Sequence, residues 1–285
     1  MAKMSRMLDN IGFQLAKKWI AGITITEAIT ESKRTNTKGK MVMINYLGES
    51  VTDVKPIKAN VDTYKRLLNA MRLAKVKGCI AIKPTQLGLS ISEGLCYKNC
   101  LEIARAAKKN GFFVWIDMEE LKYVAGTITT YFRLLKKQDN IGICIQAKLK
   151  RSFDDAKKIA ANGGKIRLVK GAYTGPITVM YQKRSEVYAN YLKIMKYLFA
   201  TSNHFIIATH DDKLIKEAQR LAKLYHKQFS FAMLKGIREN LAAKLAKTNE
   251  IFIYLPFGKE WFAYSARRLK ERNNLLLVAR SVFQQ

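Results

Sequence analysis

The sequence predicts an α/β protein with the (β/α)8 barrel fold, and three observations support this prediction. From residue 41 onward, short apolar segments alternate with longer amphipathic segments. There are eight apolar segments, which is the number of strands in such a barrel. The length of 285 residues and the hydrophobic content of 48% suit one domain of this fold. Strands that alternate with helices pair in parallel through crossover helices. The alternative is an open doubly wound sheet, which is disfavoured because no Gly-x-Gly-x-x-Gly motif follows the first predicted strand.

Residues 1–40 are predicted to form an N-terminal helical segment, followed by the barrel domain over residues 41–285. The first helix is indicated by apolar residues at helical spacing, namely Leu8, Ile11, Leu15 and Trp19. Lys17 and Lys18 lie off that face, so the helix either contacts a membrane surface or, more commonly, packs on its own domain. A second helix is predicted next, with Glu27 near its start and Lys33 and Arg34 near its end.

The eight predicted strands are short and rich in residues that favour strands. Their ranges are Met41–Leu47, Cys79–Lys83, Phe112–Asp117, Ile141–Ala147, Lys165–Lys170, His204–Thr209, Gln228–Leu234 and Ile251–Leu255. Amphipathic stretches between them predict helices, for example Glu93–Lys109, Tyr181–Phe199 and Lys213–His226.

Polar groups gather where the predicted strands end. In barrels of this kind the active site lies at the C-terminal ends of the strands. Those ends read Gly48-Glu49, Lys83-Pro-Thr85, Asp117-Met-Glu119, Gln146, Lys170-Gly-Ala-Tyr173, Thr209-His-Asp211, Leu234 and Tyr254-Leu-Pro-Phe-Gly258. A purely structural barrel does not need so many polar groups on one rim, so the pattern predicts a site there.

Two basic stretches stand out. Arg167 lies among the strand formers of Lys165–Lys170, and Lys170 directly precedes Gly171, which suits an anionic or planar ligand or, alternatively, basic side chains that reach solvent at the rim. Near the C-terminus, one face of a predicted helix carries Tyr264, Arg267, Arg268 and Glu271. Its two guanidinium groups can hold a small carboxylate, although a charged outer helix face is the common alternative.

The formal net charge of +29 implies attraction to an anionic partner, either nucleic acid or a membrane surface. The basic residues are scattered, which also fits a lysine-rich solvated surface. The four cysteines, Cys79, Cys96, Cys100 and Cys144, show no zinc-ligand spacing, so no metal is expected and they are interpreted as reduced core residues. With no apolar run long enough to span a bilayer and no signal-peptide pattern, we expect a cytoplasmic location.

Ten motifs occur in one order along nearly the whole chain. They are Trp19-Ile-Ala-Gly22, Tyr46-Leu-Gly-Glu49, Ile82-Lys-Pro-Thr-Gln-Leu-Gly88, Ile116-Asp-Met-Glu119, Ile145-Gln-Ala147, Arg167-Leu-Val-Lys-Gly-Ala-Tyr173, Ala208-Thr-His210, Met233-Leu234, Tyr254-Leu-Pro-Phe-Gly258 and Tyr264-x-x-Arg-Arg-Leu-x-Glu271. On these motifs the chain resembles the FAD-dependent proline dehydrogenases, in their monofunctional microbial form.

The resemblance implies a distorted (β/α)8 barrel with FAD at its mouth and the final helix over the substrate. The implied flavin contacts are Met118, Gln146, Lys170, Gly171, Ala172, Thr209 and His210, with Arg167 beside the isoalloxazine ring. The implied substrate side consists of Lys83, Asp117, Tyr254, Tyr264, Arg267, Arg268 and Glu271. Among all these residues, Asp117 and Arg167 are assigned catalytic roles.

The resemblance also implies the reaction, which is the first step of proline catabolism. L-proline would lose a hydride from its ring to flavin N5 and become 1-pyrroline-5-carboxylate, with a quinone as the electron acceptor. Because a quinone lies in the bilayer, we expect peripheral attachment to the anionic inner face of the membrane, with the basic face near Lys17 and Lys18, beside Trp19, as the first candidate contact. No nucleic-acid partner is expected.

The chain departs from the family pattern at a few positions. The family usually has Glu, Gln and Tyr where this chain has Ser230, Ala232 and Lys235, and Tyr where it has Lys148. These changes predict either weaker FAD binding or a different set of contacts at the adenylate end of the cofactor. Two other functions stay open on the residues alone: a Schiff-base aldolase that uses Lys83 or Lys170, and a nucleic-acid binder, which would leave the ordered motifs unexplained.

Overall fold

The computed structural model describes residues 16–270, with side chains through Arg267, and contains a closed barrel of eight parallel strands. The strands pair in chain order, and β8 closes the barrel against β1. Their bounds are β1 Met41–Tyr46, β2 Gly78–Ile82, β3 Val114–Ile116, β4 Ile141–Gln146, β5 Lys165–Val169, β6 Phe205–Ala208, β7 Ser230–Leu234 and β8 Glu250–Phe257. The predicted (β/α)8 barrel is confirmed, and every strand lies within two residues of its predicted bounds.

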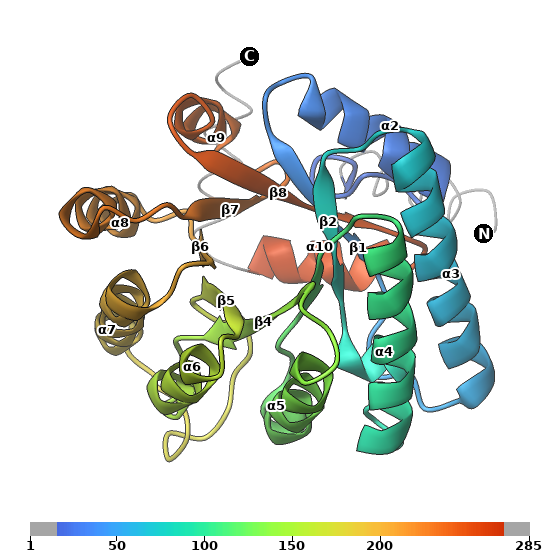
Figure 1. The fold of residues 1–285 in the computed structure, drawn as a ribbon, viewed down its shortest axis with the longest axis horizontal. Coiled ribbons are helices and arrows are strands. Elements are labelled where there is room, and N and C mark those ends of the chain that lie inside the picture. Colours follow the sequence, from blue (N-terminus) through green and yellow to red (C-terminus); the bar gives the residue numbers. More distant parts are fainter. Residues whose placement is uncertain (1–15, 271–285) are drawn as a thin grey trace, which may run out of the picture.

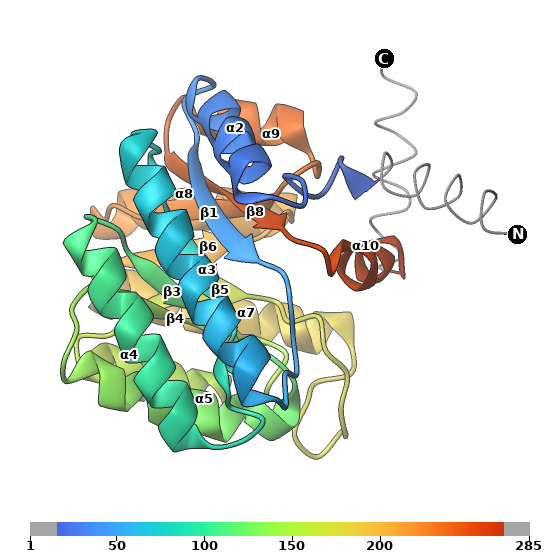
Figure 2. The same cartoon turned by 90° about the vertical axis from the view of Figure 1, so that its right-hand side faces the viewer.

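Helices surround the barrel (Figure 1). They are α2 Ile25–Asn36, α3 Val54–Leu73, the short 3-10 helix η1 Pro84–Leu87, α4 Glu93–Lys109, α5 Leu121–Leu135, α6 Ser152–Ala161, α7 Arg184–Thr201, α8 Asp212–Tyr225, α9 Glu239–Leu245 and α10 Trp261–Lys270. Figure 2 shows α10 apart from the others, at the end of the barrel toward which the strands point. Within residues 16–270, no helix is both long enough and apolar enough to cross a membrane.

The apolar core has two layers, because successive strand residues point to opposite faces of the sheet. One layer fills the space between the strands and the helices, and the other lies inside the barrel around Met43, Trp115 and Phe252. Gly142 makes room for the inner layer, since a Cβ at this position would lie 2.5 Å from the ring of Trp115. The interior of the barrel therefore contains an apolar layer, which lies between the strands.

The second helix predicted from the sequence is confirmed as α2. It begins at Ile25, and Thr24 caps it: the Thr24 hydroxyl accepts a hydrogen bond from Glu27 N at 3.2 Å, and the Glu27 carboxylate accepts one from Thr24 N at 2.9 Å. This reciprocal pair satisfies two of the backbone donors that a helix start leaves free. The helix leads directly into β1, so it fixes where the barrel begins.

The described part of the N-terminal segment packs on the barrel. Trp19 and Ile20 are buried against Leu47, Ile237 and Tyr264. Burial of Trp19 agrees with the more common alternative, in which this segment packs on its own domain, and the expected membrane contact of the basic face near Lys17 and Lys18 stays a prediction. The rest of that predicted helix, with Leu8, Ile11 and Leu15, lies outside the described residues.

Candidate functional site

Four side chains from the predicted site meet at the C-terminal end of the barrel, around Asp117. One oxygen of Asp117 bonds to the Arg167 guanidinium, and the other accepts a hydrogen bond from the Tyr254 hydroxyl at 2.7 Å. Lys83 Nζ lies 3.7 Å from this second oxygen. The side chains of Lys83, Asp117 and Arg167 are buried. The sequence prediction therefore selected residues that the fold brings into direct contact.

The strand ends explain why Lys83 and Asp117 lie together. Each is the first residue after its strand, β2 and β3 respectively, and Asp117 N donates to Ile82 O at 2.9 Å. This backbone hydrogen bond continues the parallel pairing one residue beyond the sheet. Arg167 comes from inside β5 and Tyr254 from inside β8, so both reach the cluster from the interior of the barrel.

Electrostatics fix the charges in this cluster. Burial alone would raise the pKa of Asp117, but Arg167 and Lys83 outweigh it and hold that pKa below its usual value. Burial alone would lower the pKa of Lys83 and of Arg167, yet Asp117 and other neighbours raise both. Burial, reinforced by Asp117, raises the pKa of Tyr254. At neutral pH the cluster thus holds one anion, two cations and a neutral phenol.

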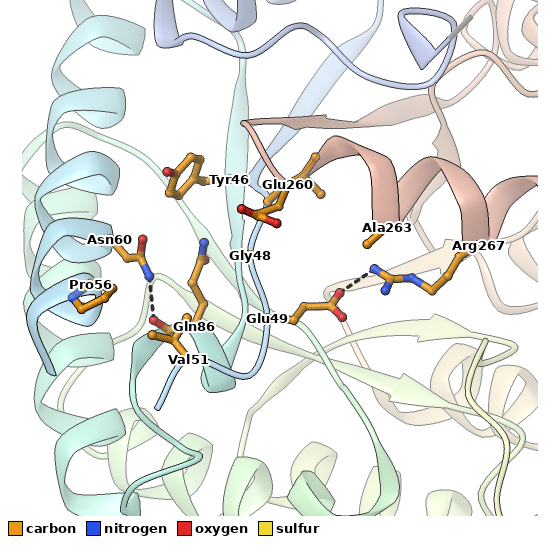
Figure 3. Close-up of a pocket in the computed structure, with 11 residues that line it drawn as sticks. Tyr46, Gly48, Glu49, Val51, Pro56, Asn60, Gln86, Glu260, Ala263 and Arg267 are labelled. Atoms are coloured by element: carbon orange, nitrogen blue, oxygen red, sulfur yellow. Dashed lines mark hydrogen bonds and ion pairs between the residues drawn. The ribbon is translucent and has the colours of Figure 1, made fainter. Parts of the chain in front are cut away.

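Glu49 links this cluster to α10. Its carboxylate accepts a hydrogen bond from Arg267 at 2.8 Å (Figure 3). The same oxygen lies 3.2 Å from Lys83 Nζ. Glu49 belongs to the polar rim that the sequence predicts, but neither the residues alone nor the family resemblance gave it a role. The signal that could have found it is an acidic residue after the first strand in a chain whose last helix carries paired arginines.

A cavity of about 400 Å³ adjoins the Glu49–Arg267 pair, between the loop after β1, the start of α3, and α10. Figure 3 shows Asn60 and Gln86 on one side of it and Glu260, Ala263 and Arg267 on the other. Arg267 is its one lining residue from the predicted site, and the cluster around Asp117 lies outside its lining. We therefore place the site at the cluster, with this cavity as its neighbour.

The predicted cofactor residues form two further groups on the same rim. Gln146 donates its amide to Met118 O at 2.9 Å and to Glu119 O at 3.2 Å, which ties the end of β4 to the segment after β3. Gly171 lies against Gln146 with φ +100°, and a Cβ there would lie 3.1 Å from the Gln146 Cβ. Glycine is required at this turn because the backbone both adopts a left-handed conformation and approaches its neighbour closely.

The second group follows β5 and β6. Lys170 pairs with Asp211 at 2.8 Å, and Asp211 N donates to the Thr209 hydroxyl at 3.1 Å. Burial would raise the pKa of Asp211, but the contact with Lys170 and backbone donors lowers it. His210 turns away toward β7, where its Nε2 accepts a hydrogen bond from Leu234 N at 3.1 Å. Ala172 is exposed beside this group.

The remaining predicted residues belong to α10 and the chain beyond it. Tyr264 is buried in the cluster that holds Trp19 and Ile237. The side chain of Arg268 and all of Glu271 lie outside the described residues. In the described range, no group of three or more His, Cys, Asp and Glu is arranged to hold a metal ion.

The departures from the family pattern are spread along the barrel. Ser230 opens β7 and bonds to Glu250 at the start of β8, so it lies at the opposite end of the barrel from the mouth. Ala232 belongs to the inner apolar layer. Lys235 follows β7 at the mouth end and donates to Lys17 O at 2.9 Å. The expectation that Ser230 changes cofactor contacts is therefore not supported by its position, and Lys235 instead holds the N-terminal segment.

Comparisons with known proteins identify a family and several relatives. A family model described as proline dehydrogenase matches residues 28–276. Proline dehydrogenase 1 of Bacillus subtilis subsp. natto is 32% identical over 261 residues, which cover 90% of this chain and 86% of the relative. Proline dehydrogenase 2 of Bacillus subtilis (strain 168) is 31% identical over 281 residues, covering 97% and 93%.

Solved structures show the same fold. Proline utilization A from Bdellovibrio bacteriovorus, inactivated by N-propargylglycine, superimposes with a TM-score of 0.88 at 22% identity, covering 95% of this chain and 34% of that one. The protein of the same name from Corynebacterium freiburgense gives 0.80 at 24% identity, covering 95% and 32%. The chain thus spans about a third of those longer proteins but most of the shorter relatives. By its sequence, this chain belongs to the proline dehydrogenase family.

Proposed function

We propose that this protein oxidises L-proline to 1-pyrroline-5-carboxylate at the barrel mouth, with FAD as its cofactor and a quinone as its electron acceptor. The observation that carries the proposal is the buried cluster around Asp117 and its link through Glu49 to Arg267. A zwitterionic amino acid needs a cation for its carboxylate and an anion near its amine, and this cluster offers both within one small region.

Arg267 is the proposed partner of the substrate carboxylate. Its guanidinium holds the Glu49 carboxylate at 2.8 Å, so it already binds the chemical group that proline would present. When proline binds, its carboxylate would replace the Glu49 carboxylate as the partner of Arg267. Glu49 would keep its contact with Lys83. The family resemblance adds Arg268, Tyr264 and Glu271 to this side of the site.

Asp117 is proposed to orient the site instead of taking up a proton. Both of its oxygens already have partners, Arg167 on one and Tyr254 with Lys83 on the other. Its lowered pKa also disfavours protonation near neutral pH. Its role is to hold Arg167 and Tyr254 in place and to keep the buried guanidinium compensated.

FAD fits the residues that the rim provides. Arg167 Nε is buried and has no hydrogen-bond partner among the described residues, and a polar ring edge bound beside it would satisfy this donor. Lys170 is a half-exposed cation on the rim, suited to a pyrophosphate, and the close turn at Gly171 leaves no side chain in the way. Met118, Gln146, Ala172, Thr209 and His210 complete the proposed contacts. When bound, FAD supplies the acceptor for the hydride that proline loses.

The Arg167 cation would stabilise negative charge that accumulates near it during the reaction, and burial strengthens that effect. The competing aldolase function needs a neutral lysine as nucleophile. Lys83 is a poor candidate because its pKa is raised by Asp117 and Glu49, and Lys170 is held in an ion pair. The dehydrogenase is therefore the better-supported function.

The test is an absorbance spectrum of the purified protein before and after anaerobic L-proline. We expect a bound yellow flavin that bleaches when proline is added and recovers when a quinone is added. A protein with no flavin, or a flavin that proline does not bleach, would contradict the proposal. Trapping of a Schiff base by borohydride would instead favour the aldolase.

We further propose that the protein works at the anionic inner face of the membrane, as a peripheral protein of the cytoplasm, because its quinone acceptor lies in the bilayer. The formal net charge of +29 supports this location, since each basic residue near an anionic leaflet contributes roughly 1 kcal/mol. The measurement is co-sedimentation with anionic and neutral vesicles over a salt series. Absence of binding to anionic vesicles at low salt would favour a soluble acceptor.

A further inference from the structure

The loop between β5 and α7 is held in a defined shape at the mouth end of the barrel. Leu149 and Met180 form an antiparallel bridge, Lys150 N donates to Val179 O at 3.0 Å, and Tyr181 N donates to Lys148 O at 2.9 Å. These contacts join the loop to the one after β4 as a short ribbon. In Figure 2 this loop, drawn in yellow, projects on the same side of the barrel as α10.

The tip of this loop exposes apolar side chains. Ile177 is 68% exposed and Val179 is 38% exposed, whereas neighbouring Met180 is fully buried in the core. The buried methionine anchors the ribbon, so the two aliphatic side chains are held outward by the fold. Most large apolar residues of the described chain are covered, and a pair of exposed aliphatic residues on an anchored loop is a feature of surfaces that bind a partner.

Positive charge surrounds the tip. The two segments that form the ribbon, residues 147–151 and 170–184, contain six basic residues and no acidic residue. Arg151 pairs with Asp155 and Lys170 with Asp211. In the part of the chain that the structure describes, the side chains of Lys148, Lys150 and Lys183 form no ion pair, although the Glu186 carboxylate accepts a hydrogen bond from Lys183 N at 3.0 Å. An apolar tip flanked by uncompensated cations is complementary to an anionic phospholipid surface.

We propose that the β5–α7 loop is the membrane-docking element of this protein, with Ile177 and Val179 entering the bilayer interface and Lys148, Lys150 and Lys183 contacting anionic headgroups. The inference rests on the proposed use of a membrane quinone and adds the surface that contacts the bilayer. It also moves the proposed contact from the basic face near Lys17 and Lys18, beside the buried Trp19, to this loop. The loop follows the strand that carries Arg167, so docking here would bring the barrel mouth close to the membrane.

The first test places a fluorescent reporter on the tip. All four native cysteines are buried, so Ile177→Cys provides one accessible thiol for a polarity-sensitive dye. Leu224→Cys is the matched control: Leu224 is 59% exposed and flanked by Lys223 and Lys227, but it lies at the end of α8 that leads into β7, at the opposite end of the barrel. We expect a blue shift with anionic vesicles at position 177 and none at position 224. Equal shifts, or no shift at 177, would overturn the proposal.

The second test compares binding with activity. Ile177→Ser with Val179→Ser should lower partitioning into anionic vesicles by about tenfold, because the aliphatic burial is lost. Lys150→Gln with Lys183→Gln should lower it further at low salt, and Leu224→Ser should leave it unchanged. Proline oxidation with a soluble dye as acceptor should stay at the level of the unmodified protein in all variants.

The outcomes separate this inference from the proposed function. If the unmodified protein lacks proline-dependent dye reduction, the proposed function fails. If it oxidises proline and binds vesicles but the loop variants bind equally well, only the loop assignment fails. If the serine variant binds normally while the glutamine variant does not, and duplex DNA competes with vesicles, the surface is a general anion site and the docking proposal is wrong.

Discussion

Asp117→Asn tests the buried cluster most directly. The change keeps the size of the side chain but removes its charge, which leaves Arg167 and Lys83, with side chains only 5% and 10% exposed, without their shared anion. Loss of one partner from a buried ion pair costs about 3–5 kcal/mol. At roughly 2 °C per kcal/mol for a chain of this size, the melting temperature should fall by about 6–10 °C.

The assay is denaturant unfolding followed by circular dichroism, with Asp211→Asn as control. Asp211 also pairs with a lysine, but Lys170 is 44% exposed, so loss of that charge should cost about 1 kcal/mol or less. Adding Arg167→Met to Asp117→Asn should recover part of the lost stability, because the stranded cation is removed. Similar losses for Asp117→Asn and Asp211→Asn would refute the view that Asp117 compensates buried charge.

The pH dependence follows from the same cluster. The folded pKa of Asp117 lies below its unfolded value, so its charge stabilises the fold above the unfolded pKa, and this contribution is lost as pH falls through the folded pKa. The stability difference between the unmodified protein and Asp117→Asn should therefore be constant from about pH 8 to 5 and shrink below about pH 4. A difference that does not change down to pH 3 would contradict this assignment.

Two further predictions concern α10 and the N-terminal segment around Trp19. Arg267→Lys should raise the KM for proline about tenfold to a hundredfold with flavin still bound, because an ammonium cannot replace the planar guanidinium group. Arg220→Lys changes an arginine in an exposed ion pair on α8 and should leave the KM unchanged. A normal KM in Arg267→Lys would show that Arg267 does not bind the substrate carboxylate. Gly236→Ala should release the N-terminal segment, because a Cβ at this position would lie 2.1 Å from Lys18 O. Hydrogen exchange should then show that the backbone amides near Trp19 lose their protection. Gly39→Ala shares the positive φ but has open space, so it should cost only about 1 kcal/mol and leave that protection intact.

The sequence by itself determined the fold and most of the rim. Strand and helix periodicities follow from which residues must be buried, so β1 to β8 could be found to within two residues. In a parallel barrel all strand ends meet at one mouth, which is why reading those ends in order located Lys83, Asp117 and Tyr254 without coordinates. The family motifs assign these residues to the substrate side by resemblance alone.

Tertiary structure alone decided which of these residues touch and which face the interior. Contacts such as Glu49 with Arg267 join residues 218 positions apart, and no local pattern encodes such a pairing. The same holds for Trp19, because its place on the apolar face of a predicted helix does not tell which residues cover it, and in the structure it packs with Ile237 and Tyr264. Burial and long-range partners are properties of the closed barrel, so they became visible only when the strands had been brought together.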